Sequence, residues 1–233
     1  MKYTKLSFVM MLMAMVALLA VGCSDDDNDN PMNSQPELSQ VMVVHASPDA
    51  PAVDLVVDNT VAGSGLTFPA NTGYLPVEAG TRNIKVRVTA DPSIVPIEAN
   101  LTLDANKNYS VFAIDSVSSI EPLVIVDDLT SPAEGMAHVR FIHLSPDAPA
   151  VNITTTNNAS TVFGNIAFKQ YTAFTPLPAG SYDLEVRLAA NDGLALDLPT
   201  ITLESGKIYT VFAKGFAAGS GSEALGAEII VNN

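Results

Sequence analysis

One stretch of nine residues occurs twice in this chain of 233 residues. It reads His-Ala-Ser-Pro-Asp-Ala-Pro-Ala-Val at 45–53 and His-Leu-Ser-Pro-Asp-Ala-Pro-Ala-Val at 143–151. The likeness continues beyond this repeated motif, because Val111-Phe112-Ala113 recurs at 211–213 after a short insertion in the second copy. Self-similarity at a fixed period indicates that one structural unit has been duplicated.

The duplication predicts two domains, at 40–129 and 136–233. Units of this length can enclose a hydrophobic core without disulfides or metal ions. Between them, Thr-Ser-Pro-Ala-Glu-Gly at 130–135 is typical of a short linker.

Apolar residues within each unit recur with period two. Ile84, Val86 and Val88 alternate with polar residues, as in a strand with one buried face. The mature chain shows no amphipathic helical spacing, and its frequent turn residues are typical of sandwiches and barrels. We therefore predict an all-β chain with two tandem immunoglobulin-like β-sandwich domains. Seven or eight strands are expected per unit, in the first near 40–46, 52–58, 60–67, 72–78, 82–90, 96–103, 108–115 and 121–127.

One turn differs informatively between the copies. Asn106 in the first unit becomes Gly206 in the second. Both residue types tolerate positive φ. We expect these residues to occupy the left-handed position of a hairpin turn.

The first 22 residues predict a signal peptide, with Lys2 and Lys5 before an apolar run. Leu-Ala-Val-Gly-Cys at 19–23 resembles the lipobox of bacterial lipoproteins, which implies cleavage before Cys23 and lipidation of its thiol. The alternative is an uncleaved transmembrane anchor, but the apolar run is shorter than the ~20 residues that span a bilayer. Cys23 is the only cysteine, so the mature domains are expected to contain no disulfide and no cysteine-based metal site.

Residues 23–39 are expected to form a disordered, acidic tether, because they are too polar to fold alone. Asp25, Asp27 and Asp29 resemble the start of a calcium loop, but Asn30 and Pro36 stand where that loop needs Gly and Glu. Serine and acids directly after the lipid cysteine also resemble the surface-export signal of Bacteroidetes lipoproteins. That resemblance implies an outward-facing protein of the outer membrane.

The mature chain is strongly acidic. Removing residues 1–22 leaves 9 basic and 25 acidic side chains, a net charge of about −16. This charge repels nucleic acid and anionic membrane surfaces. We therefore expect no nucleic-acid partner, and we assign membrane attachment to the lipid anchor alone.

The repeated motif contains the residue types of a hydrolytic or metal site: His45, Ser47 and Asp49, and again His143, Ser145 and Asp147. A turn is the favoured interpretation, because proline presets φ while Ser and Asp side chains bond nearby backbone amides. No oxyanion hole accompanies the motif, so no catalytic residue is assigned. Metal binding is the less remote alternative, but its best extra ligand, Asp54, becomes Asn152 in the second copy.

Other motifs of catalysis or cofactor binding do not occur. The chain has no Gly-x-Ser-x-Gly, no phosphate-binding loop and no His-Glu-x-x-His. The absence of Trp also weakens a sugar-stacking surface. No enzyme activity, cofactor or metal is expected.

The duplicated motif, a Pro-x-x-Ala-Gly turn and a Lys-x-Tyr-x-Val-Phe-Ala strand together resemble a bacterial family catalogued as domain of unknown function 4397. The resemblance covers both units and implies β-sandwich modules in secreted or lipid-anchored envelope proteins, without an established activity. We expect a non-enzymatic, lipid-anchored cell-envelope protein that acts as a binding or adhesion module for an unidentified protein or glycan. The alternative is a structural or accessory component of an envelope assembly.

Overall fold

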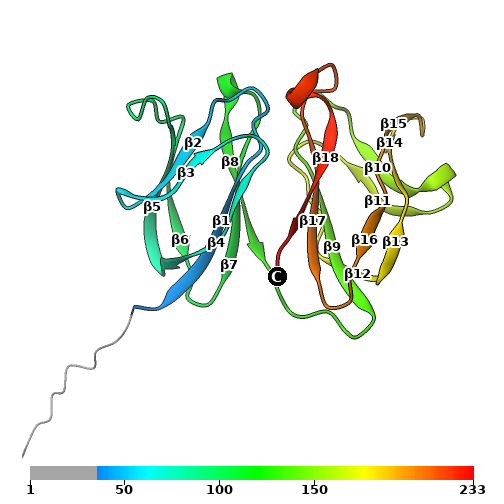
Figure 1. The fold of residues 1–233 in the computed structure, drawn as a ribbon, viewed down its shortest axis with the longest axis horizontal. Coiled ribbons are helices and arrows are strands. Elements are labelled where there is room, and N and C mark those ends of the chain that lie inside the picture. Colours follow the sequence, from blue (N-terminus) through cyan, green and yellow to red (C-terminus); the bar gives the residue numbers. More distant parts are fainter. Residues whose placement is uncertain (1–35) are drawn as a thin grey trace, which may run out of the picture. The chain divides into compact units, whose positions relative to one another are not determined.

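A computed structural model describes residues 36–233, which form one compact unit. The predicted signal peptide at 1–22, the lipidation site Cys23 and the tether up to residue 35 lie outside the described residues. The prediction of an all-β chain with two tandem sandwiches is confirmed (Figure 1). Within 36–233, no helix has the length and apolar character needed to cross a membrane.

The first repeat contains eight strands, and each predicted strand matches one of them within two residues at either end. Strand β1 begins at Leu38, because Ser39 is buried and its hydroxyl donates to the Val77 carbonyl oxygen at 3.0 Å. The strand thus includes the last two residues of the predicted tether. The bounds are β1 Leu38–His45, β2 Val53–Val57, β3 Thr60–Leu66, β4 Asn71–Glu78, β5 Gly80–Val88, β6 Ile97–Leu103, β7 Asn108–Ile114 and β8 Glu121–Asp127, with a 3₁₀ turn η1 at Val117–Ser119.

These strands form two sheets that enclose a core. The inner sheet has the order β4-β1-β7-β8, with β1 and β7 parallel, and the outer sheet has the order β3-β2-β5-β6. Val41, Val43 and Val111 from the inner sheet pack with Leu55 and Ile84 from the outer sheet. The alternation seen in the sequence therefore corresponds to a sandwich with a buried inner layer.

The second repeat has the same plan with interrupted outer strands. Its inner sheet has the order β12-β9-β17-β18, and its outer layer comprises β11-β10-β14-β15 and β13-β16. Pro199 lies between β15 and β16, where it offers no amide hydrogen to a ladder. The bounds are β9 Met136–His143, β10 Val151–Thr155, β11 Thr161–Ile166, β12 Thr175–Pro178, β13 Gly180–Tyr182, β14 Leu184–Leu188, β15 Leu194–Asp197, β16 Ile201–Leu203, β17 Ile208–Lys214 and β18 Gly226–Val231, with 3₁₀ turns η2 at Thr156–Asn158 and η3 at Gly221–Glu223.

The inner sheets of the two repeats pack against each other through a shared core. Phe112 and its counterpart Phe212 meet edge to face there, with ring centroids 6.1 Å apart. Along β1, Val41 and Val43 point into the sandwich, whereas Met42 and Val44 join the shared core. The inner strands are buried on both faces, which is why they read as nearly continuous apolar runs.

The predicted left-handed turn is present in both repeats. Asn106 has φ of 60° and Gly206 has φ of 80°. The expectation of a hairpin is wrong, however, because β6 pairs with β5 while β7 pairs with β1 and β8. The turn carries the chain from the outer sheet to the inner sheet, a difference that local sequence does not encode.

Both copies of the repeated motif lie at the same end of the described unit. Strands β1 and β9 run toward this end and finish at His45 and His143, directly before the two motif loops (Figure 1). The chain enters the unit at the opposite end, where β1 begins. The linker between β8 and β9 also lies at that opposite end.

Candidate functional site

The two motif histidines are buried and hold equivalent hydrogen bonds. Nε2 of His45 lies 3.0 Å from the Pro51 carbonyl oxygen, and Nε2 of His143 lies 3.0 Å from that of Pro149. Because a carbonyl oxygen only accepts, Nε2 carries the hydrogen in both rings. Burial lowers the pKa of both imidazoles below the ordinary value, which favours the neutral form. Nε2 is thus occupied as a donor and is not free to act as a base or a metal ligand.

The motif aspartates tie the motif loops to the chain that follows the central inner strands. Oδ1 of Asp49 accepts from the Val117 amide at 2.7 Å, and Oδ1 of Asp147 accepts from the Ala217 amide at 2.7 Å. Both aspartates are exposed. Each carboxylate therefore bridges two loops at the same end of its sandwich.

The motif serines are fully buried, and neither the Ser47 nor the Ser145 hydroxyl has a hydrogen-bond partner among the described residues. The Nδ1 atoms of His45 and His143 share this property. Within 36–233, no hydrogen bond joins the histidine, serine and aspartate of either copy, so the contacts of a Ser-His-Asp triad are not made. The described chain also contains no group of three or more His, Cys, Asp or Glu placed to hold a metal ion.

Asp54, the extra metal ligand considered from sequence, is engaged with its own repeat. Its carboxylate accepts from the Gly65 amide at 3.0 Å and the Thr89 hydroxyl at 2.8 Å, and it faces Arg87 at 3.4 Å. These bonds, led by that of Gly65, lower the pKa of the carboxyl. Its counterpart Asn152 instead accepts from a backbone amide of β11 at 2.7 Å. Asp54 therefore organises the β2–β3 hairpin.

A groove of about 350 Å³ lies beside the first motif copy and is shared by the two repeats. The first repeat contributes residues 48–52 with Thr67 and Phe68, and the second contributes Ser222 and Glu223. Lys214 of the second repeat lies over the Phe68 ring, with Nζ 5.5 Å from its centroid. This shared groove is open and mostly polar, and it joins one motif copy to the other repeat.

A smaller apolar cavity of about 210 Å³ lies beside the second motif copy. His143 and Pro149 border it, together with Ala195, Ala213 and Leu225 among others. At the matching end of the first repeat, the apolar side chains pack into a buried cluster: Val53, Leu66, Val86, Ile97 and Ala113, with Ile120 against them. The two motif loops are therefore alike, but their surroundings differ.

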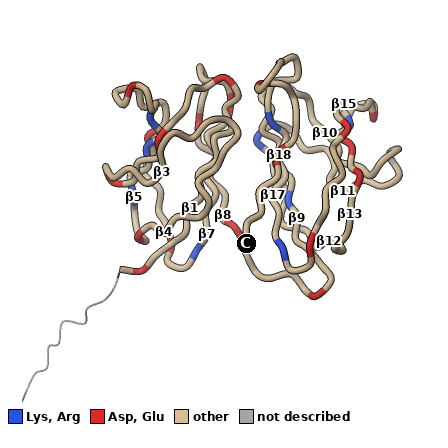
Figure 2. The backbone as a smooth tube through the Cα atoms, viewed as in Figure 1, with Lys and Arg blue, Asp and Glu red and all other residues tan. Residues whose placement is uncertain are grey.

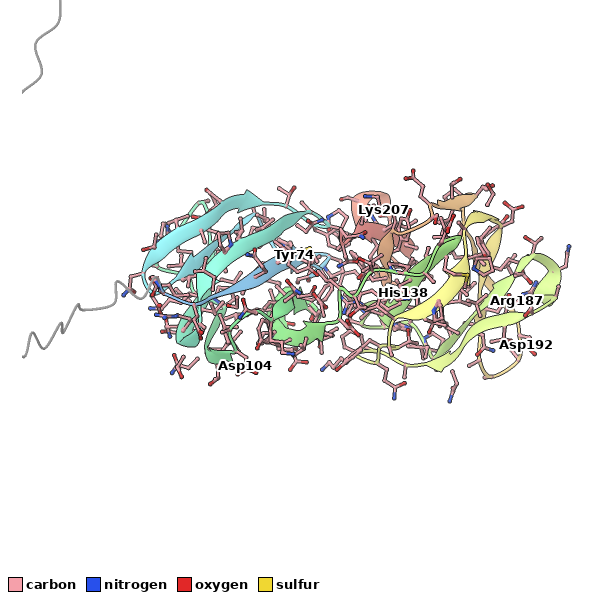
Figure 3. The ribbon with its side chains drawn as sticks, turned by 90° about the horizontal axis from the view of Figure 1, so that it is seen from below. Tyr74, Asp104, His138, Arg187, Asp192 and Lys207 are labelled. Carbon is pink, nitrogen blue, oxygen red and sulfur yellow. The ribbon has the colours of Figure 1, made fainter. Side chains whose placement is uncertain are left out.

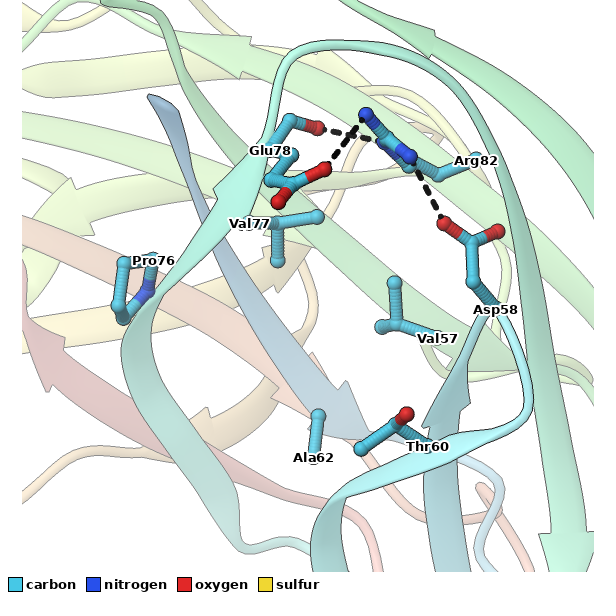
Figure 4. A pocket seen from close by; sticks show the side chains of 8 residues that line it. All are labelled: Val57, Asp58, Thr60, Ala62, Pro76, Val77, Glu78 and Arg82. Atoms are coloured by element: carbon cyan, nitrogen blue, oxygen red, sulfur yellow. Dashed lines mark hydrogen bonds and ion pairs between the residues drawn. The ribbon is translucent and has the colours of Figure 1, made fainter. Parts of the chain in front are cut away.

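A third hollow, of about 320 Å³, lies near the β2–β3 and β4–β5 turns (Figure 4). Arg82 borders it and bonds to Asp58 at 3.1 Å, to the Glu78 carboxylate at 3.2 Å and to backbone oxygens of Glu78 and Ala79. All three guanidinium nitrogens hold a carboxylate or carbonyl oxygen, so this hollow offers no ready anion site.

Charged residues are dispersed over both repeats (Figure 2). Many of the basic side chains form ion pairs with acids, as Lys85 does with Glu98 at 3.1 Å and Lys214 with Glu228 at 3.1 Å. Such pairing leaves little positive charge to gather into the basic surface that binds nucleic acid.

A buried charge pair that sequence reasoning missed crosses the interface between the repeats. The guanidinium of Arg140 donates to the Asp127 carboxylate at 2.5 Å and to the Ser110 hydroxyl at 3.2 Å, and its Nε donates to Thr210 at 2.8 Å. The side chains of Arg140 and Asp127 are 2% and 0% exposed. Aligning the copies would have provided a signal, because Arg140 interrupts an apolar strand where the first copy has Met42.

The remaining contacts close a ring of hydrogen bonds around this pair. The Tyr74 hydroxyl donates to Asp127 at 2.5 Å and accepts from Asn232 at 3.1 Å, and Asn232 in turn accepts from Thr210 at 2.8 Å. Burial and Asp127 raise the pKa of Tyr74, so the phenol stays protonated. Tyr74 lies where the two repeats meet (Figure 3). We call this cluster the polar ring: Tyr74, Ser110 and Asp127 from the first repeat with Arg140, Thr210 and Asn232 from the second.

Comparisons with known proteins identify a family. The model of a domain of unknown function, DUF4397, matches residues 39–154 and 155–233. The division between the matches lies within β10, so the first match includes the second motif copy. No curated protein matches the chain.

Among solved structures, the C-terminal domain of AlgF from P. aeruginosa is similar at 13% identity, with 42% of this chain and 97% of that chain covered and a TM-score of 0.30. A leucine-rich repeat protein from Bacteroides thetaiotaomicron is similar at 14% identity, with 76% of this chain and 26% of that chain covered and a TM-score of 0.19.

Proposed function

The chain belongs to the DUF4397 family, as its repeated motif predicted, and from that premise we propose that it is a non-enzymatic, lipid-anchored binding or adhesion module of the bacterial cell envelope. The observation that carries this proposal is the placement of the two motif loops at one end of the described unit, opposite the end where the chain enters (Figure 1). A protein anchored through its N-terminus would present this motif-bearing end away from the membrane.

Two further observations support binding. The motif histidines and aspartates hold the motif loops in a fixed conformation, as in the bonds of Asp49 and Asp147 to backbone amides. The shared groove adds an open, mostly polar surface formed by both repeats. Paired loops on one chain also suit a repetitive ligand, because the second contact becomes intramolecular.

The anchor is tested by replacing its cysteine. We expect the full chain to fractionate with membranes and to be extracted by detergent, whereas Cys23→Ala should move it to the soluble fraction. Retention of Cys23→Ala in salt-washed membranes would contradict lipid anchoring.

The groove is tested with glycan arrays and whole-cell adhesion assays on the full chain in detergent micelles. Ser222→Trp should block the groove and reduce binding at least tenfold. The matched control is Thr130→Trp, an exposed residue of the linker at the opposite end, which should leave binding unchanged. Equal effects of the two variants would argue against the motif-bearing end as the place where the ligand binds. Stoichiometric co-purification with one envelope protein, without glycan binding, would favour a structural role in an assembly.

A further inference from the structure

The two faces that meet between the repeats come from equivalent strands but differ in charge. Met42 pairs with Ser110 in the first repeat as Arg140 pairs with Thr210 in the second. Arg140 therefore occupies the position of Met42. By the same reasoning from strand register, Asp127 on β8 corresponds to Asn232 beside β18. Each face thus carries one member of the charge pair and a neutral side chain at the other position.

We propose that Arg140 and Asp127 determine which faces can pair. The inner face of the first repeat accepts the inner face of a second repeat, and neither face accepts a copy of itself. The occupant of each face is the other repeat of the same chain.

Burial makes this discrimination strong. Two first-repeat faces brought together would enclose two Asp127 carboxylates without a guanidinium, and two second-repeat faces would enclose two Arg140 side chains without a carboxylate. A buried charge that has lost its partner is strongly destabilising, because its hydration is not replaced. The native pairing leaves neither charge alone, since the polar ring adds four further hydrogen bonds to the two charged groups.

Stability alone does not account for the pair. The surrounding shared core is apolar, with Phe112, Phe212 and Ile142 fully buried, and an apolar substitute for a buried ion pair is often equally stable. A charge pair at the centre of a nearly symmetric interface instead penalises wrong partners. It would prevent two first repeats, or two second repeats, of neighbouring chains from pairing through their inner faces.

A double-mutant cycle on the full chain tests the coupling. Arg140→Met and Asp127→Asn each introduce the residue that the other copy carries. Each single change should lower the melting temperature by roughly 10 °C, and the double variant should lie within about 4 °C of the wild type. The matched control is the surface pair in Lys85→Met and Glu98→Gln, with a half-buried lysine and an exposed glutamate, whose effects should be below about 4 °C and additive. Additive losses at Arg140 and Asp127 would overturn the proposal.

Charge reversal tests the choice of partner. One chain carries Arg140→Asp and a differently tagged chain carries Asp127→Arg, so that each alone encloses like charges. Refolded together, they should form a 1:1 heterodimer in size-exclusion chromatography with light scattering, because each first repeat then finds an opposite charge in the other chain. Both reversals in one chain should restore the monomer. If that monomer folds but the mixture yields no heterodimer, or if each single reversal gives a monomer of wild-type stability, the proposal is overturned.

Discussion

The motif-bearing ends of the two repeats share a hydrogen-bond frame and differ in what surrounds it. In both, the motif histidine bonds to a proline carbonyl oxygen at 3.0 Å and the motif aspartate accepts from a backbone amide at 2.7 Å. The first repeat packs this end with a buried apolar cluster, whereas the second leaves a cavity of about 210 Å³ beside His143. Nearly identical motifs therefore determine the loop, and neighbouring side chains decide whether it borders a cavity.

Comparing the two ends distinguishes residues that only shape the motif loop from residues that also contact its surroundings. A residue that shapes the loop should matter equally in both repeats. A residue that also packs against the surroundings should matter differently in the two repeats. Equivalent substitutions at the two ends can therefore distinguish these roles.

Removing the motif histidines should have the largest effect. His45→Ala and His143→Ala each delete a buried ring and leave a proline carbonyl without its donor, which should cost about 2–4 kcal/mol in urea unfolding of the full chain. The loss should be about 1 kcal/mol smaller at His143, because the adjacent cavity already admits relaxation. An equal or larger loss of stability in His143→Ala would show that the adjacent cavity does not help the structure to relax around the deleted ring.

Asp54→Asn converts the residue after the first motif copy to its counterpart in the second. The pKa of Asp54 is lowered in the folded protein, so its contribution to stability is present above the ordinary pKa of about 3.9 and is lost as pH falls through the folded value. The variant should be less stable than the wild type at pH 7, and the gap should close below about pH 4. A gap that is constant between pH 7 and pH 3 would contradict the role of the charge.

Asp49→Ala and Asp147→Ala should cost about 1 kcal/mol each, because each leaves one backbone amide without its acceptor. The losses should be equal within error, since the bond lengths match. Asp49→Asn keeps an acceptor oxygen and should restore most of the loss. Chemical denaturation of the three variants checks this. A difference above about 1 kcal/mol between Asp49→Ala and Asp147→Ala would contradict equivalent roles for the two aspartates.

Filling the cavity should have the smallest effect. Ala195→Val places two methyl groups on β15, where Ala195 lines the cavity and is partly buried, and should stabilise the chain by about 0.5–1 kcal/mol. The control Ala217→Val adds the same groups at an exposed cavity residue and should change stability by less than about 0.5 kcal/mol. Destabilisation by Ala195→Val alone would indicate that the space is smaller than 210 Å³ implies.

Much of the fold follows from the sequence because its determinants are local. Apolar runs, period-two alternation and turn residues together located the eight strands of the first repeat, and the Asn106/Gly206 exchange identified a left-handed turn. The sheet that each strand joins does not depend on local sequence. The partner of each strand lies far away in sequence, so the turn after β6 was mistaken for a hairpin.

Local sequence patterns are enough to establish that a β-sandwich was duplicated, that each copy opens with the same loop, and that an acidic chain follows a lipobox-like segment. The folded structure was needed to find that the inner sheets of the copies share a core and that both motif loops lie at one end. It also brought Arg140 beside Asp127, two residues on separate strands that no spacing rule connects. The physical reason is that alternation reports which side of a strand is buried, whereas the identity of the covering surface depends on packing between distant segments.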